Sequence, residues 1–139
     1  MTQAGRTVPL VLYFDGASRG NPGPAAFGVF SSSGVRISEA IGSTTNNVAE
    51  WRGFLAALNA AVASGAARVE IRADSQLVVR QFLGEYRMKA DHLRPYLEEA
   101  RRRAGRIADL RVVHVRREEN READALANAA LDRARSRAP

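Results

Sequence analysis

Four carboxylates stand at positions that an ordinary surface role does not explain. Asp15 ends the most hydrophobic stretch of the chain and is followed by a glycine-rich segment. Glu50 and Asp124 each precede apolar residues at helical spacing, which places both on the apolar face of a predicted helix. Asp74 follows a short alternating strand, at the strand end where ligands gather. Lone carboxylates on core faces are costly unless they are paired or bind a cation, so all four are candidate functional residues.

Each of these acids also has an ordinary explanation. Asp74 would suit the N-cap of the helix that follows it. Glu50 would be favoured by the positive end of its helix dipole, and Asp124 would pair with Arg121 on the last helix. Asp15 has the weakest ordinary explanation, a simple turn after its strand. The individual residues therefore leave structure and function open.

If the sheet brings the four acids together, their charges repel one another unless cations compensate. The chain has no cysteine and only two histidines, which excludes disulfides and thiolate sites and leaves oxygen ligands. An all-oxygen cluster suits Mg²⁺ or Mn²⁺, and two such ions can align an attacking water with the leaving oxygen of a phosphodiester. The net charge of +6, with 21 basic residues against 15 acidic ones, favours a polyanionic partner. These residues are typical of a metal-dependent nuclease.

Hydrophobic periodicity predicts nine elements that would carry these acids. The predicted strands are Val8–Phe14, Ala25–Ser31, Val35–Ile41, Val69–Ala73 and Leu110–Val115. The predicted helices are Val48–Ala63, Leu77–Leu83, Arg94–Ala104 and Asn120–Arg135, with irregular segments at Gly16–Pro24 and Glu85–His92. This order, β-β-β-α-β-α-α-β-α, predicts an α/β fold: a mixed five-stranded sheet with helices on both faces.

The length of 139 residues suits one domain. We expect residues 1–139 to form a single domain, with residues 136–139 as a frayed tail. The apolar stretches are too short for a membrane span and lack the flanks of a signal peptide. We therefore expect a cytoplasmic monomer with no membrane partner and no small-molecule organic cofactor.

Four blocks of sequence, in chain order, resemble the type 1 ribonuclease H family. They are Asp15–Pro24 (DGASRGNPGP) followed by Gly28, Thr44–Glu50 (TTNNVAE), Asp74–Gln76 (DSQ) and Glu119–Ala127 (ENREADALA). Together the blocks span nearly the whole chain. The resemblance implies the ribonuclease H-like fold and endonucleolytic cleavage of the RNA strand of an RNA/DNA hybrid, leaving 3′-hydroxyl and 5′-phosphate ends.

The resemblance also implies roles for individual residues. Asp15, Glu50, Asp74 and Asp124 would ligate two Mg²⁺ ions, for which Mn²⁺ can substitute. Glu50 would also meet a ribose 2′-hydroxyl, the group that distinguishes RNA from DNA. Small polar residues match family positions that line the minor groove of the hybrid: Gly16, Ser18, Asn21, Asn46, Asn47 and Gln76. Thr45 and Asn21 would form part of a pocket for a phosphate of the DNA strand.

Two segments depart from the family pattern. In place of the tryptophan-bearing basic protrusion of larger members, Gly84–Pro95 is short and contains no tryptophan. Its cations are Arg87, Lys89 and Arg94. The resemblance therefore implies a compact form that binds its substrate through residues outside this segment.

The second departure concerns a histidine that many members carry in the loop before the last helix. Here alternation with Leu110 and Val112 places His114 within the fifth strand. We expect His114 to be structural and Arg117, in the following loop, to act as the catalytic residue at that position. The alternative, that His114 takes this role, stays open.

Two other functions compete with hybrid cleavage. A non-catalytic hybrid-binding domain of the same fold would be expected to lack a metal ligand, and none of the four acids is missing. Another DNA nuclease of the same fold, such as an integrase or resolvase, would share scattered acids. It would not explain the NPG loop together with TTNNVAE.

Overall fold

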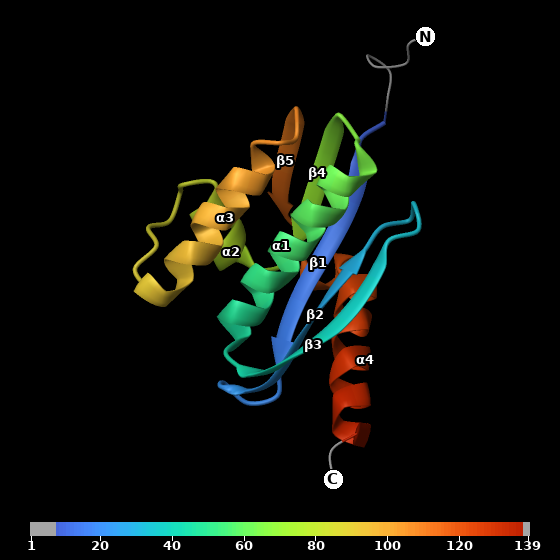
Figure 1. Ribbon diagram of the computed structural model, residues 1–139, viewed down its shortest axis with the longest axis vertical. Coiled ribbons are helices and arrows are strands. Elements are labelled where there is room, and N and C mark those ends of the chain that lie inside the picture. Colours follow the sequence, from blue (N-terminus) through green and yellow to red (C-terminus); the bar gives the residue numbers. More distant parts are fainter. Residues whose placement is uncertain (1–7, 138–139) are drawn as a thin grey trace.

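A computed structural model describes residues 8–137, which form a five-stranded sheet flanked by helices (Figure 1). The strands are β1 (Leu10–Ser18), β2 (Gly23–Phe30), β3 (Arg36–Thr44), β4 (Arg68–Ala73) and β5 (Asp109–His114). They lie in the order β3-β2-β1-β4-β5. β1 pairs antiparallel with β2 and parallel with β4, and β4 pairs parallel with β5. The predicted mixed sheet is confirmed.

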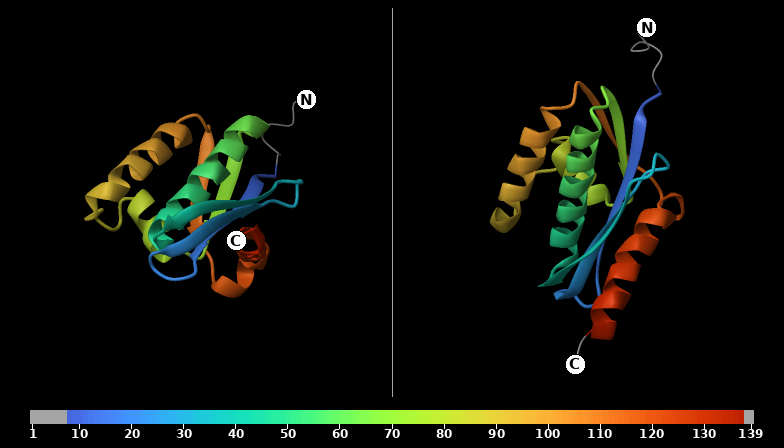
Figure 2. Two further views of the ribbon diagram at one scale, coloured as in Figure 1. Left: turned by 60° about the horizontal axis from the view of Figure 1, so that its bottom comes forward. Right: turned by 45° about the vertical axis from the view of Figure 1, so that its right-hand side comes forward.

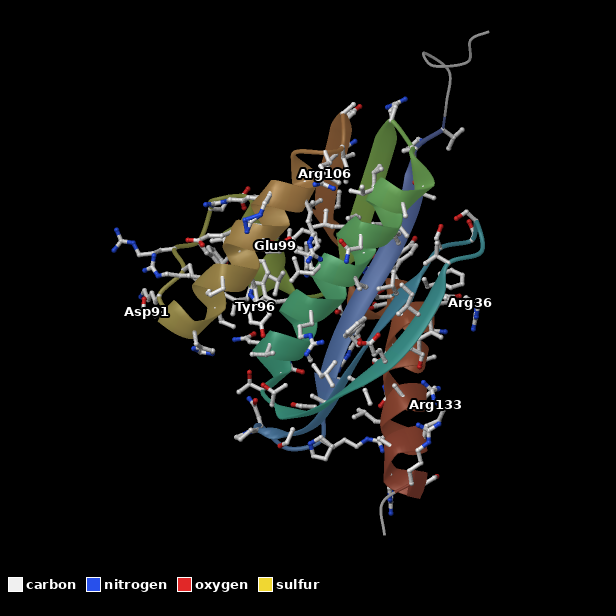
Figure 3. All side chains as sticks on the ribbon, viewed as in Figure 1. Arg36, Asp91, Tyr96, Glu99, Arg106 and Arg133 are labelled. Carbon is white, nitrogen blue, oxygen red and sulfur yellow. The ribbon has the colours of Figure 1, made fainter. Side chains whose placement is uncertain are left out.

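The helices cover both faces of this sheet, as predicted. They are α1 (Asn46–Ser64), α2 (Gln76–Phe82), α3 (Arg94–Ala104) and α4 (Arg121–Arg137), with short 3₁₀ helices η2 (Asp91–Leu93) and η3 (Arg117–Glu119). Figure 2 shows α1 and α3 on one face and α4 on the other. Arg133 of α4 donates hydrogen bonds to the backbone oxygen and Oγ of Ser38 at 2.9 Å each, which ties α4 to β3 (Figure 3).

α1 is held against β1 by a stacked aromatic pair in the core. The helix begins where Thr45 Oγ1 accepts the N–H of Val48 at 3.2 Å, and it ends at Gly65 in the left-handed conformation, with φ 72°. Phe54 of α1 and Phe14 of β1 are both fully buried, and their ring centroids lie 5.2 Å apart. This packing fixes the helix that carries Glu50 beside the strand that carries Asp15.

β1 is displaced toward the C-terminus relative to its predicted range of Val8–Phe14. Val8 is 79% exposed, and the strand begins at Leu10. At its other end β1 continues to Ser18, because its last residues stay paired with β2 as far as Ser18 and Ala25. The predicted irregular segment therefore shrinks to residues 19–22, and Asp15 lies inside the strand instead of at its end.

Two further expectations need correction. α4 extends to Arg137, so Ser136 and Arg137 are helical and not frayed; residues 138 and 139 lie outside the described part. The segment expected to be irregular before α3 ends in a 3₁₀ turn that begins at Asp91. Among residues 8–137, no helix is long and apolar enough to cross a membrane.

Candidate active site

Three of the four predicted acids meet at one end of two paired parallel strands. Tyr13 of β1 pairs with Arg72 of β4, so Asp15 and Asp74, each two residues further along, lie side by side. Glu50 reaches the same place from α1. Carboxylate oxygens of Asp15, Glu50 and Asp74 all lie within 4.8 Å of one another. The predicted convergence is confirmed for these three acids.

Asp124 approaches this group from the opposite face of the sheet. It lines the same cleft, which has a volume of about 610 Å³, although its carboxylate is outside the group of three. Asp15 pairs across the sheet with Gly28, and a Cβ at Gly28 would overlap the backbone oxygen of Ala123. The absence of a side chain at Gly28 thus allows α4 to bring Asp124 over Asp15.

Burial and mutual repulsion strongly perturb two of the acids. Burial, followed by the charges of Asp74 and Glu50, raises the pKa of Asp15 from 3.8 to about 9, and a side-chain hydrogen bond with Asp124 contributes to the rise. Burial raises the pKa of Glu50 from 4.5 to about 7. Carboxylates that are this hard to ionise together favour a cation between them.

Ser75, for which the sequence predicted no separate role, holds Glu50 in place. Its hydroxyl donates a hydrogen bond to the Glu50 carboxylate, as does the backbone N–H of Gly16, and both bonds lower the pKa of Glu50 against the effect of burial. Ser75 Oγ also accepts the N–H of Val78 at 3.3 Å and so caps α2. The cap that Asp74 would have supplied is therefore made by Ser75, which leaves the Asp74 carboxylate to the cleft.

Asn120 is a second residue for which the sequence predicted only a helix start. It is 1% exposed, and its Nδ2 donates to the backbone oxygen of Phe14 at 2.9 Å and to Asp74 Oδ1 at 3.5 Å. Its Oδ1 is buried and has no hydrogen-bond partner among the described residues. Asn120 thus connects the start of α4 to the two strands that carry Asp15 and Asp74. No signal in the sequence indicated these bonds, because an asparagine before an apolar helix is equally suited to begin that helix.

His114 and Arg117 both line the acidic cleft. His114 is the last residue of β5, as predicted, whereas Arg117, which was predicted to lie in a loop, begins the short 3₁₀ helix η3. The guanidinium of Arg117 lowers the pKa of Glu50. The expectation that His114 is structural is wrong in one respect, because its side chain is exposed at the cleft while Val112 is buried.

The residues predicted to contact substrate lie on and around the cleft. Three of them line it together with the acids: Gly16, Ser18 and Asn46. Asn21 Oδ1 accepts the backbone N–H of Asn46 at 3.1 Å, which joins the turn at residues 19–22 to the start of α1. The hydroxyl of Thr45 caps this helix. Contacts of these residues with substrate stay predictions.

The remaining predicted contacts, Asn47 and Gln76, lie beyond the acidic cleft. Asn47 lines a second cavity, of about 530 Å³, between the start of α1 and the segment after α2. Arg87 and Lys89 line the same cavity, so the short segment that replaces the protrusion places positive charge beside α1. Gln76 is the first residue of α2, and its side chain is exposed.

Comparisons with known proteins agree with this architecture. A family model described as reverse transcriptase-like matches residues 13–130. Ribonuclease HI of Halobacterium salinarum is 46% identical over 125 residues, which are 86% of this chain and 63% of that protein. A crystal structure of RNase H1 from this archaeon has a TM-score of 0.83 and covers 91% of this chain and 99% of its own. The chain therefore spans less than two thirds of the full length of the Halobacterium salinarum ribonuclease HI sequence.

Two further relatives match over nearly their whole length. Ribonuclease H of Phenylobacterium zucineum is 35% identical, with 92% of this chain and 94% of that protein aligned. LC11-RNase H1, whose structure was solved in complex with an RNA/DNA hybrid, is 37% identical with a TM-score of 0.81, over 90% of this chain and 98% of its own. Fold and acidic site together define a ribonuclease H-like domain with a carboxylate cluster that could hold a metal ion. The chain belongs to the ribonuclease H family.

Proposed function

We propose that the chain is an endonuclease that hydrolyses the RNA strand of RNA/DNA hybrids and leaves 3′-hydroxyl and 5′-phosphate ends. The observation that carries the proposal is the grouping of three carboxylates within 4.8 Å at the end of paired parallel strands. The hybrid bound by LC11-RNase H1, at 37% identity, supports the choice of substrate.

The donor set of the cleft fits two Mg²⁺ ions, with Mn²⁺ as a substitute. Asp15, Glu50, Asp74 and Asp124 offer only carboxylate oxygens, the ligands that hard cations prefer. Burial, followed by repulsion from Asp74 and Glu50, raises the pKa of Asp15 to about 9, and a bound cation would relieve that repulsion. When bound, two such ions would activate the attacking water and stabilise the charge on the leaving oxygen.

The protein's own groups would orient the substrate around these acids. Ser75 and the backbone of Gly16 hold the Glu50 carboxylate, which we place against a ribose 2′-hydroxyl and which would thereby select RNA. Arg117 lines the cleft beside Glu50, and its permanently charged guanidinium would hydrogen-bond the scissile phosphate. His114 at the same cleft is the alternative for this role.

Short polar side chains would read the minor groove without a sequence code. We assign this contact to Gly16, Ser18, Asn21, Asn46, Asn47 and Gln76. Thr45 and Asn21 would take a phosphate of the DNA strand at the start of α1, where the helix dipole favours an anion. Arg87 and Lys89 would add sequence-independent attraction from the second cavity.

We further propose that the chain acts as a monomer in the cytoplasm, without an organic cofactor. All four acids come from one chain, so the cleft needs no residue from a second copy. The absence of cysteine suits a reducing compartment. Replication primers and R-loops are the hybrids that such an enzyme would meet.

The test is an incubation of matched RNA/DNA hybrid, double-stranded RNA and double-stranded DNA with the protein in Mg²⁺, Mn²⁺ or EDTA. We expect cleavage of the hybrid in either metal, none in EDTA, and none of double-stranded DNA. A hybrid with 2′-deoxy sugars at and beside the scissile position should resist cleavage. Equal cutting of that substrate would overturn the proposal.

Asp15→Asn and Asp74→Asn separate catalysis from binding. Both variants should lose hydrolysis and retain hybrid binding, because each removes a metal ligand and leaves the groove contacts in place. Binding without cleavage by the parent protein in excess Mg²⁺ would favour the non-catalytic hybrid-binding domain. Preferential cutting of double-stranded DNA would favour a DNA nuclease of the same fold.

A further inference from the structure

A continuous series of hydrogen bonds along α4 connects Asp124 to the turn between β1 and β2. Asn128 lies one helical turn after Asp124, and its Nδ2 donates to Asp124 Oδ1 at 3.3 Å and to the Asp124 backbone oxygen at 3.0 Å. Arg19 Nη2 donates to Asn128 Oδ1 at 3.5 Å and to Asp132 Oδ1 at 2.7 Å. The series therefore runs from Asp132 through Arg19 and Asn128 to Asp124.

This series gives the amide of Asn128 a fixed orientation. A side-chain amide has one donor end and one acceptor end, whereas a guanidinium has only donors. With the amide reversed, its NH₂ would face the donors of Arg19 and its oxygen would face the carboxylate of Asp124. Arg19 thus ensures that a donor points at Asp124.

Folding stability alone does not explain these residues. The side chains of Arg19 and Asp132 are 39% and 68% exposed, and exposed ion pairs contribute little to stability. Asparagine inside a helix is less favourable than alanine. What Asn128 supplies is a hydrogen bond that restrains the rotation of one carboxylate at the edge of the acidic cleft.

We propose that Asn128 is a positioning residue that orients the Asp124 carboxylate for cation binding, and that Arg19 holds Asn128 in the required orientation. The inference rests on the proposed function, in which Asp124 is a metal ligand. Asn21 follows Arg19 in the same turn and accepts the N–H of Asn46. The hydrogen-bond series therefore also links Asp124, the proposed metal ligand on α4, to residues that we assign to nucleic-acid contact.

The test is metal binding to the free protein, measured by isothermal titration with Mn²⁺, alongside cleavage. Asn128→Ala should weaken Mn²⁺ binding about three- to tenfold, because outer partners of metal ligands commonly contribute at least this much. The Mg²⁺ concentration for half-maximal cleavage should rise by the same factor. kcat at saturating Mg²⁺ and the melting temperature should stay close to those of the parent.

Three variants separate positioning from a general structural effect. Asn128→Gln keeps an amide donor that can reach the residue four positions earlier, and it should restore binding. Asn59→Ala makes the same substitution at an exposed position of α1 and should leave binding unchanged. Arg19→Ala should weaken Mn²⁺ binding in the parent and add nothing further in the Asn128→Ala background.

Asp124→Asn distinguishes failure of this inference from failure of the proposed function. If Asp124→Asn weakens Mn²⁺ binding and Asn128→Ala does not, the positioning role is overturned and the proposed function stands. If Asp124→Asn leaves binding unchanged, both are overturned. Weakened binding by Asp124→Asn and Asn128→Ala, with rescue by Asn128→Gln, supports the inference.

Discussion

Gly16 and Glu50 are in backbone contact: the N–H of Gly16 donates to the Glu50 carboxylate, and a Cβ at Gly16 would overlap the backbone of Glu50. β1 and α1 thus approach each other closely at two residues that line the acidic cleft. A side chain at position 16 would push α1 away from β1.

Gly16→Ala should therefore destabilise the fold by about 1–3 kcal/mol, as overpacking a rigid backbone contact does, and should reduce cleavage strongly. Gly105→Ala is the matched control, since Gly105 has φ −63° and a Cβ there would make only ordinary contacts. Urea denaturation and hybrid cleavage of both variants provide the measurement. Equal stability of the two variants would contradict the close approach.

The raised pKa of Asp15 predicts a pH-dependent stability in EDTA. The folded state holds a proton on Asp15 up to about pH 9, whereas the unfolded chain releases it near 3.8, so the folded state binds more protons between these values. The free energy of unfolding should then fall as pH rises through this window, and Glu50 adds to the fall up to about pH 7. Thermal melts from pH 5 to 9 measure this slope.

Asp15→Asn supplies the control for that slope. The variant should flatten it and should be more stable than the parent at pH 9 in EDTA, by about 1 kcal/mol or more. Mg²⁺ should stabilise the parent increasingly as pH rises, because ions bind the deprotonated acids. A parent protein whose stability in EDTA rises from pH 5 to 9 would refute the coupling.

Asn120→Ala should destabilise the protein by about 1–3 kcal/mol, because the buried backbone oxygen of Phe14 loses its donor. Cleavage should fall as well, since the bond to Asp74 is lost. Asn59→Ala, on an exposed helix surface, is the reference for the intrinsic effect of the substitution. Urea denaturation measures the free energy of unfolding of both variants. Equal values would argue against a stabilising role for the hydrogen bonds of Asn120 to Phe14 and Asp74.

Arg117→Ala should lower kcat about tenfold or more, on the scale of losing one charged contact to the reacting phosphate. His114→Gln should leave the melting temperature unchanged, because the side chain is exposed. Steady-state cleavage of a defined hybrid by both variants decides between them. Loss of turnover in His114→Gln with parental turnover in Arg117→Ala would assign the role to His114.

Local sequence signals predicted the helices better than the strand that matters most. α3 has its predicted bounds because Pro95 occupies its first turn and Gly105 follows its last residue. The end of β1 was misplaced because glycine marks flexible backbone, whereas pairing with β2 carries Gly16 and Ser18 on into the sheet. Such pairing depends on a partner strand, so the sequence of the segment alone does not predict it.

The same distinction holds for the site. The four acids could be singled out as candidates because a carboxylate on an apolar helix face, or after a strand, is unusual among its neighbours in sequence, and the family resemblance then implied their role. Asn120 and Ser75 carry no such conflict, since both suit a helix start, and their bonds reach residues far away in the chain. The exposure of His114 could not be predicted because it depends on where β5 ends relative to the cleft.

The acids of the cleft come from β1, α1, the end of β4 and α4, so each interface between these elements must form before the set is complete. A chain with native helix content but one unformed interface would have a nearly native circular dichroism spectrum and would not cleave the hybrid. Hybrid cleavage is therefore a stricter reporter of full assembly than circular dichroism, and during thermal inactivation its loss should coincide with the first sub-global opening that separates any two of the four elements.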